Sequence, residues 1–104
     1  MTKIKTVMYI SIRKYKTKNA AEVARRVNEQ FLEQIGKVSG LRGYYLIDTG
    51  GGVVASVNIF DTKEGVEESN KIGVAWAREA VADLLEPGQV EITAGQVVAE
   101  KTAS

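Results

Sequence analysis

The sequence has no cysteine and no histidine, and it contains a single proline and a single tryptophan. The lack of cysteine and histidine excludes disulfides, thiolate nucleophiles, serine–histidine triads, zinc sites of the usual kind and histidine-ligated haem. Any chemistry must come from tyrosine, serine, asparagine, tryptophan, arginine, lysine and carboxylate side chains. We therefore expect neither a metal site nor a cofactor.

Long hydrophobic runs are also missing. No apolar stretch approaches the ~18 residues of a membrane-spanning helix, and the N-terminal stretch MTKIKTVMYISIRKYK alternates apolar and polar residues, unlike a signal peptide. We predict a cytoplasmic protein with no membrane partner. A chain of 104 residues, 44% of them apolar, can build one hydrophobic core but not two. We therefore interpret residues 1–104 as a single domain.

Charge is unevenly distributed along the chain, although the formal net charge is only +1. Basic residues dominate the first half, with their densest run at Arg13–Lys18, and acidic residues dominate the second half. One interpretation of this run is a patch that binds anions or nucleic acid. The sequence favours the other interpretation, a solvated strand end, because nucleic-acid binding requires more basic surface and a recognisable reading element. We expect no nucleic-acid partner.

The stretch Leu41–Asp61 predicts a β-hairpin. Two segments rich in aromatic and branched residues flank Thr49–Gly52, whose three glycines supply the positive φ angles of a tight reversal. If the loop is Thr49–Gly52, Asp48 lies opposite Val53, and successive side chains alternate between the two faces of the sheet.

This register assigns the hairpin side chains to two faces. One face carries Tyr44, Leu46, Val53, Ala55, Val57 and Ile59, and the other carries Tyr45, Ile47, Val54, Ser56, Asn58 and Phe60. Neither set is typical of a solvent-exposed surface, so we expect both faces of the sheet to be covered. A slip of one residue in either strand would move all of its side chains to the opposite face.

A strand and a helix are predicted before the hairpin. Residues 5–15 alternate as a strand, and one of its faces carries Val7, Tyr9, Ser11, Arg13 and Tyr15. Asn19 is then a candidate helix cap, with Glu22 as its capping-box partner, and the helix extends to about Ile35. The inner stripe of this helix is formed by Val23, Ala24, Val27, Phe31 and Ile35.

A second helix is predicted after the hairpin. Asp61 and Glu64 repeat the pattern of a cap and its partner, and the helix extends to about Leu85. Each of its two glycines, Gly65 and Gly73, costs about 1 kcal/mol relative to alanine, so we expect a kink or a helix in two pieces. The inner stripe comprises Val66, Gly73, Ala77, Ala80 and Leu84.

The segment Val90–Ala99 alternates again and predicts a fourth strand. The order β-α-β-β-α-β predicts an α+β, ferredoxin-like fold, in which two helices cover one face of a four-stranded antiparallel sheet. Since both faces of the hairpin are apolar, the face without helices also needs a partner. A second copy of the same sheet is the simplest one, and we expect a homodimer that closes two sheets into a barrel.

Three stretches carry a resemblance to a known family. They are Ser39–Tyr45, Val54–Phe60 running into a capped helix, and Glu67–Asn70 with Trp76 six positions on. With them the chain resembles the dimeric α/β-barrel superfamily, near uncharacterised stand-alone members of its antibiotic-biosynthesis-monooxygenase-like branch. The resemblance spans nearly the whole chain. It implies the fold more specifically than the activity, because members include cofactor-free oxygenases, haem-degrading enzymes, isomerases and proteins without a known role.

The chain departs from that family at two points. The third strand of family members often ends in a tryptophan that faces the ligand cleft, and this chain has Phe60 there. Haem-degrading members carry an axial histidine on the second helix, and this chain has none, which argues against haem degradation. The resemblance also implies that the face with Phe60 looks toward the helices, where these proteins keep their pocket.

The predicted ligand site follows from that face. It comprises Tyr45, Ser56, Asn58 and Phe60 on the strands, with Asn70 and Trp76 on the second helix. Each polar group buried there without a partner would cost about 1–3 kcal/mol, so these groups bond either one another or a ligand. We predict one of two functions: a cofactor-independent monooxygenase-like enzyme for an aromatic or polyketide-like compound, or a ligand-binding or accessory dimer without turnover. If these polar groups bond one another and Trp76 packs in the core, the cleft is simply filled.

Overall fold

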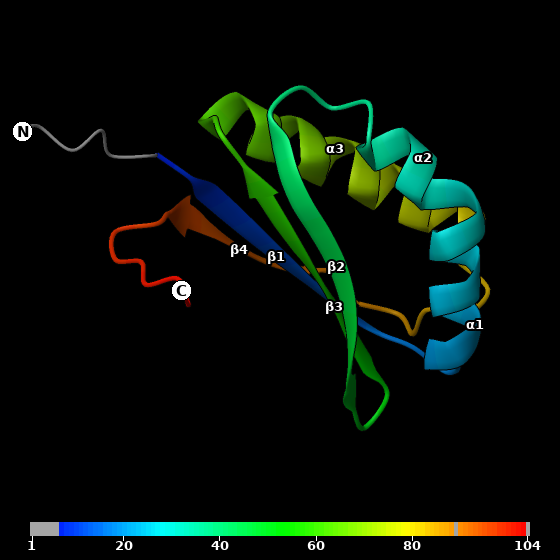
Figure 1. The fold of residues 1–104 in the computed structure, drawn as a ribbon. Coiled ribbons are helices and arrows are strands. Elements are labelled where there is room, and N and C mark those ends of the chain that lie inside the picture. Colours follow the sequence, from blue (N-terminus) through cyan, green and yellow to red (C-terminus); the bar gives the residue numbers. More distant parts are fainter. Residues whose placement is uncertain (1–6, 89, 104) are drawn as a thin grey trace, which may run out of the picture.

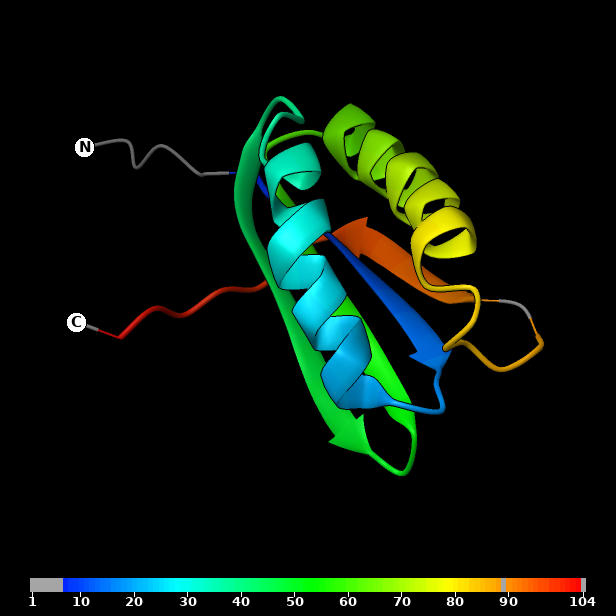
Figure 2. The ribbon, with the colours of Figure 1, turned by 90° about the vertical axis from the view of Figure 1, so that its right-hand side faces the viewer.

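The computed structural model describes residues 7–88 and 90–103. Its elements are β1 (Tyr9–Lys16), α1 (Ala20–Arg26), η1 (Val27–Phe31), α2 (Leu32–Ile35), β2 (Leu41–Gly50), β3 (Val53–Phe60), α3 (Lys63–Ala80) and β4 (Glu91–Gln96). The strands form one antiparallel sheet in the order β2-β3-β1-β4. The continuous helical segment α1-η1-α2 and the helix α3 cover the same face of it (Figure 1, Figure 2). The predicted ferredoxin-like α+β fold is confirmed.

The predicted strand boundaries need small corrections. The first strand begins at Tyr9, and residues 5 and 6, which were also assigned to it, lie outside the described residues. The last strand is shorter than the predicted Val90–Ala99, because its pairing with β1 stops at Gln96. No helix in the described part of the chain is both long and apolar enough to cross a membrane.

The turn between β2 and β3 differs from the predicted four-residue loop. The turn is formed by Gly51–Gly52, both at positive φ, and Gly50 pairs with Val53. A bulge between Asp48 and Gly50 makes Asp48 pair with Val54 instead of Val53. The Asp48 carboxylate stabilises this bulge by accepting a hydrogen bond of 2.9 Å from the Gly50 amide. The predicted register is therefore wrong by one residue.

The corrected register exchanges the two faces of β2. Tyr44 pairs with Asn58 and lies on the face that the helices cover, which we call the covered face. Tyr45 pairs with Val57 and lies on the opposite, open face, where its side chain is 60% exposed. The open face also carries Ile10, Ile12, Ile47, Ala55 and Ile59.

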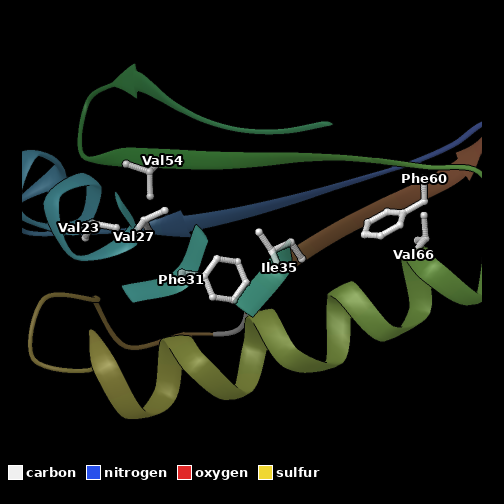
Figure 3. Close-up of a cluster of buried hydrophobic side chains, with 7 residues drawn as sticks. All are labelled: Val23, Val27, Phe31, Ile35, Val54, Phe60 and Val66. Carbon is white, nitrogen blue, oxygen red and sulfur yellow. The ribbon is translucent and has the colours of Figure 1, made fainter. Parts of the chain in front are cut away.

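The hydrophobic core lies between the covered face and the helices (Figure 3). Its buried cluster comprises Val23, Val27, Phe31, Ile35, Val54, Phe60 and Val66. The four residues from α1, η1 and α2 recur at intervals of four, so in a regular α-helix each would rotate by about 40° relative to the last. The π-helical turn η1 holds more residues per turn and keeps these side chains on one face.

The predicted cap of the first helix is confirmed, whereas that of the second is shifted. The Asn19 side chain accepts a hydrogen bond of 3.1 Å from the Glu22 amide. At the start of α3 the capping residue is Thr62, whose hydroxyl accepts a 3.0 Å hydrogen bond from the Gly65 amide. The predicted cap, Asp61, instead forms an ion pair of 2.9 Å with Arg42.

The second helix is not divided into two pieces at its glycines, which was one of the two expected outcomes. The helix α3 is continuous, although it ends at Ala80 and not near Leu85. Both glycines are positions where the helix closely approaches a neighbour. A Cβ atom at Gly65 would lie 2.6 Å from the Phe60 ring, and one at Gly73 would lie 2.5 Å from the Arg13 guanidinium. Helix propensity alone makes these two glycines destabilising. Close packing explains why they are nevertheless present.

Candidate functional site

Polar side chains occupy the centre of the covered face. The pairing of β1 with β3 sets Ser11 opposite Asn58 and Arg13 opposite Ser56. All four residues are at most 2% exposed. A buried polar group requires a hydrogen-bond partner. These four side chains therefore need partners from one another or from the helix that faces them.

The helix α3 supplies these partners. Ser69 and Asn70 face the strands one turn before Gly73, and Ser69 is fully buried. Together with the four strand residues they form the polar cluster, which comprises Ser11, Arg13, Ser56, Asn58, Ser69 and Asn70. Because Gly73 has no side chain, the helix backbone lies directly against the guanidinium of Arg13.

Arg13 is the centre of the polar cluster. Its Nη1 donates hydrogen bonds to Ser69 Oγ at 3.1 Å and to Asn70 Oδ1 at 3.0 Å, and its Nη2 donates to Asn58 Oδ1 at 3.2 Å. Its Nε is buried and has no partner. Within residues 7–88 and 90–103 no carboxylate forms an ion pair with it. Since arginine keeps its charge in proteins, a buried cation is held here by neutral oxygen atoms alone.

Asn58 uses its whole side chain within the cluster. Its Oδ1 accepts hydrogen bonds from Arg13 and from Ser69 Oγ, the latter at 3.0 Å. Its Nδ2 donates to the Ser11 carbonyl at 3.1 Å and to Ser56 Oγ at 3.0 Å. The Asn70 carbonyl oxygen likewise accepts hydrogen bonds from two side chains, those of Ser11 and Arg13. Both amides therefore hold the guanidinium in position.

A small cavity adjoins the polar cluster. Its volume is about 30 Å³, counted as space open to the centre of a water-sized sphere. Its aromatic walls are Tyr15, Phe31, Tyr44 and Trp76, and Arg13, Ser56 and Gly73 also border it. The Phe31 ring centroid lies 5.1 Å from that of Trp76 and 5.6 Å from that of Tyr44. A volume of about 30 Å³ accommodates one or two water molecules but not an aromatic ring.

The two tyrosines of the cavity retain their protons at neutral pH. Burial raises the pKa of Tyr44 to about 12, and the nearby charge of Arg13 only partly opposes this rise. Burial also raises the pKa of Tyr15, again against the influence of Arg13. Both phenols therefore stay neutral and can donate hydrogen bonds into the cavity.

The structure separates the predicted site residues into groups. Ser56 and Trp76 line the cavity. Asn58 and Asn70 do not border it, but they hold the guanidinium of Arg13, which does. Ser56 and Asn58 come from β3 and Asn70 and Trp76 from α3, and whether these four residues bind a ligand stays a prediction.

The other two predicted residues lie elsewhere. Phe60 is on the covered face, but it is fully buried beside Val66 at the start of α3, at the opposite end of the core from Val54 (Figure 3). The placement of Tyr45 under the helices is wrong, because the bulge at the end of β2 turns its side chain to the open face. Tyr44 takes its place at the cavity.

Sequence reasoning missed Arg13, Ser69 and the packing role of Gly73. The expected solvated strand end is correct for Lys14, Lys16 and Lys18, which are exposed, but Arg13 is only 1% exposed. The strand alternation contained the necessary signal, since Arg13 shares its face with residues that pack under the helices. Reading Arg13–Lys18 as one charged run obscured that signal.

Carboxylates do not gather around any site in the described part of the chain. No group of three or more acidic residues there could hold a metal ion. The cavity is bordered by aromatic, aliphatic and small residues and by one cation, Arg13. Its chemistry is that of hydrogen-bond donors in an apolar setting.

Solved structures share the fold at low sequence identity. A monooxygenase of Streptomyces coelicolor, from the gene ActVA-Orf6 and in complex with nanaomycin D, is 16% identical over 95% of each chain, with a TM-score of 0.72. A dimeric ferredoxin-like protein from an uncultured marine organism is 16% identical over 96% of this chain and 95% of its own, with a TM-score of 0.66.

A third structure, a putative antibiotic biosynthesis monooxygenase of Nitrosomonas europaea, is 17% identical over 90% of this chain and 95% of its own, with a TM-score of 0.63. These neighbours share the ferredoxin-like fold that the sequence predicts. No family model and no curated protein matches the chain. At such identities the likeness establishes the fold and leaves the activity to be inferred from the site.

Proposed function

We propose that this protein binds a small aromatic compound between the sheet and the helices and oxidises it as a cofactor-independent monooxygenase. The observation that carries the proposal is a cavity lined by aromatic rings and by the buried Arg13 guanidinium. Rings pack against a planar aromatic ligand, and the donors stabilise negative charge that develops on it. The fold shared with a monooxygenase in complex with nanaomycin D supports a ligand site in this protein.

The chemistry requires a substrate that supplies its own electrons. An aromatic compound with an acidic CH₂ group next to its conjugated ring loses a proton, and the resulting carbanion reacts with O₂. The CH₂ group becomes a carbonyl that keeps one oxygen atom, and the second oxygen atom leaves as water with both hydrogens. The residues of the chain contribute by stabilising the anion, excluding water and donating a proton to the peroxide intermediate. The protonated phenol of Tyr44 is the candidate donor.

A ring-bearing ligand requires side chains to move, because the cavity of about 30 Å³ is smaller than a ring. Two surface hollows, of about 370 and 350 Å³, share Tyr15 and Leu85 with this cavity. Rotation of these two side chains would join the hollows to it. We infer that the ligand enters past Tyr15 and Leu85.

The small volume of the cavity favours a second candidate function. If Tyr15 and Leu85 stay in place, the cavity admits only a water-sized group, and the protein is a binding or accessory dimer without turnover. The two candidates share the site and differ in whether oxygen is consumed.

Turnover and binding can be measured on the same sample. The probe is anthrone, a tricyclic aromatic compound with an acidic CH₂ group, with a protein-free blank because anthrone oxidises slowly by itself. Binding is followed by the fluorescence of Trp76, the single tryptophan, and turnover by an oxygen electrode. Oxygen uptake above the blank, with anthraquinone as product, supports the enzyme. Saturable quenching without uptake supports the second candidate, and neither signal contradicts both for this ligand class.

A matched pair of tyrosines tests the site. Tyr44→Phe removes a phenol from the cavity, whereas Tyr45→Phe removes one from the open face. Loss of a general acid typically costs about 10²-fold or more in rate. We expect kcat to fall for Tyr44→Phe and to remain unchanged for Tyr45→Phe. Equal effects of the two changes would contradict the proposed site.

We also propose that the protein is a homodimer that pairs through the open face. That face carries Tyr45 and Ile47, which are 60% and 46% exposed, and a structural neighbour is described as dimeric. Light scattering is expected to give twice the mass of one chain. Ile47→Glu should shift the mass toward one chain, while Thr49→Glu in the exposed hairpin end should not. A wild-type monomer would contradict this assembly.

A further inference from the structure

The guanidinium of Arg13 is a positive charge for which the described residues provide no negative partner. We propose that Arg13 is an anion-recognition site, and that the ligand enters the cavity as an oxyanion whose negative oxygen binds the Nε–H group. This inference rests on the proposed ligand site at the cavity. It adds the charge state of the ligand and the residue that selects it.

Burial makes the missing counter-charge significant. Arg13 is 1% exposed, so water does little to solvate its charge. A buried ion is normally paired with an opposite charge, because the dipoles of neutral partners recover only part of its hydration. The hydrogen bonds of Arg13 go to oxygens of Ser69, Asn70 and Asn58, and none of these is charged. The phenol of Tyr15 also lies close to Arg13, but it is neutral and supplies no counter-charge. An entering anion would therefore gain more here than at a surface arginine.

The hydrogen bonds of Arg13 leave donors unused. A guanidinium carries five N–H groups, and three of them are engaged by the polar cluster. Nε has no partner, and Nη2 makes one hydrogen bond although it carries two hydrogens. Nη1 makes two hydrogen bonds and points to α3. The cluster thus fixes the guanidinium and leaves Nε–H free for an acceptor.

The remaining wall of the cavity suits an acceptor with negative charge. Tyr15 and Tyr44 are protonated phenols, and no carboxylate borders the cavity among the described residues. Hydrogen bonds from such donors to an ionised oxygen are shorter and about twice as strong as those to a neutral one. The size of the cavity agrees with this, since about 30 Å³ accommodates an oxygen-bearing head group while its ring lies toward Tyr15 and Leu85.

Matched pairs of anionic and neutral compounds test the charge preference. Formate and formamide are nearly isosteric and small enough for the cavity as it stands. Benzoate with benzamide adds a ring to the carboxylate, and 4-nitrophenolate with 4-nitroanisole does the same for a phenolate. Calorimetry at one fixed pH gives the affinities. We expect each anion to bind about tenfold or more tightly than its neutral partner. The last two pairs distinguish a carboxylate from a phenolate ligand.

Two variants assign the preference to Arg13. Asn70→Asp replaces an amide by a carboxylate of the same shape and keeps the acceptor of the bonds from Ser11 and Arg13. This variant supplies the missing counter-charge, so anion affinity should fall by tenfold or more while neutral compounds bind as before. Arg13→Met removes the charge and should abolish the preference. Arg26→Met, at the surface, is the control and should retain wild-type preference.

Each outcome separates this inference from the proposed function. If benzamide binds as tightly as benzoate, the anion site is overturned and the ligand cavity stands. If formate binds in preference to formamide but no ring compound binds, the anion site stands and the aromatic ligand is overturned. Should Arg13→Met fail to fold, unchanged anion affinity in Asn70→Asp still overturns the inference.

Discussion

Arg13 and Arg26 both bind α3, but in opposite environments. Arg26, on α1, donates to the Ala80 carbonyl at 2.9 Å and forms ion pairs with Asp83 at 2.7 Å and Glu22 at 3.0 Å. Its charge is balanced by two carboxylates at the surface. Arg13 is buried, binds only neutral oxygens and has a free Nε. The charge of Arg26, which joins the helices, is therefore balanced by carboxylates. The charge of Arg13, which lies beside the cavity, is not balanced.

This difference distinguishes a structural contact from a candidate site. Arg26 also lies where the C-terminal dipole of α3 favours a cation, so its position is explained within the fold. Exposed ion pairs contribute little to stability and weaken in salt. Arg13 has no comparable explanation, because a buried cation without a counter-charge is unfavourable. Because the polar cluster holds this buried charge in place despite its cost, Arg13 is a candidate for binding a ligand.

The largest expected effect comes from deleting each arginine. Arg13→Ala leaves a cavity and removes three hydrogen bonds of the polar cluster, and we expect it to lower the free energy of unfolding by about 2–4 kcal/mol. Arg26→Ala should have a much smaller effect, and one that shrinks in high salt. Urea denaturation at two salt concentrations measures both. Equal losses for the two variants would remove the distinction between the two arginines.

The next effect concerns the close approach of α3 to Arg13. Alanine in a helix is normally more stable than glycine by about 1 kcal/mol. A Cβ atom at Gly73 would lie 2.5 Å from Arg13 Nη2, so Gly73→Ala should instead destabilise by about 1–3 kcal/mol. Gly95→Ala is the control, since no atom lies within 4 Å of its Cβ position. Thermal unfolding of both variants provides the comparison, and a stabilised Gly73→Ala protein would contradict the packing.

An effect of similar size is expected from the amide that supports Arg13. Asn58→Ala removes two acceptor bonds and two donor bonds of a fully buried side chain, and we expect a loss of about 1–3 kcal/mol. The matched control is Asn28→Ala, which removes one exposed bond of 2.8 Å to the Ala24 carbonyl. If calorimetric melting shows no greater loss for Asn58→Ala than for Asn28→Ala, the polar cluster is not a structural support.

Local patterns predicted most of the fold. The alternation of β1 and the cap at Asn19 were readable because each depends on residues close in sequence. The β2 register was not readable, because Gly50, Gly51 and Gly52 permit more than one turn, and a bulge beside them shifts the strand by one residue. That single residue explains why Tyr45 was predicted at the site and Tyr44 was not.

The candidate site was harder to predict than the fold because it depends on contacts across the sheet and the helix. Asn70 and Trp76 were found from the resemblance, and Ser56 and Asn58 from alternation. The burial of Arg13 depends on Gly73, which lies 60 positions later in the chain and makes room for it. Helix propensity takes this glycine as a weak point, whereas packing requires it. The alternation of β1 indicates the face on which Arg13 lies, but its contact with Gly73 cannot be recognised until both elements are placed.

The smallest expected effect concerns the surface ion pairs around Arg26. Hydrogen bonds from Arg25 and Arg26 lower the pKa of Glu22 from its ordinary 4.5 to about 2. A lowered carboxylate pKa contributes stability above the ordinary pKa, and this contribution is lost as the pH falls through 4.5 toward 2.

The urea midpoint of the wild type should therefore fall on acidification in this range. The fall should be shallower for Glu22→Gln and shallower again in high salt, which screens surface charges. Asp83→Asn should act in the same direction, because the hydrogen bond from Arg26 also lowers the Asp83 pKa.

The polar cluster around Arg13 has no titrating carboxylate. Asn58→Asp provides one, so this variant should add a pH dependence of stability that the wild-type cluster lacks. An acid profile that none of these changes alters would show that the surface ion pairs contribute nothing to folding.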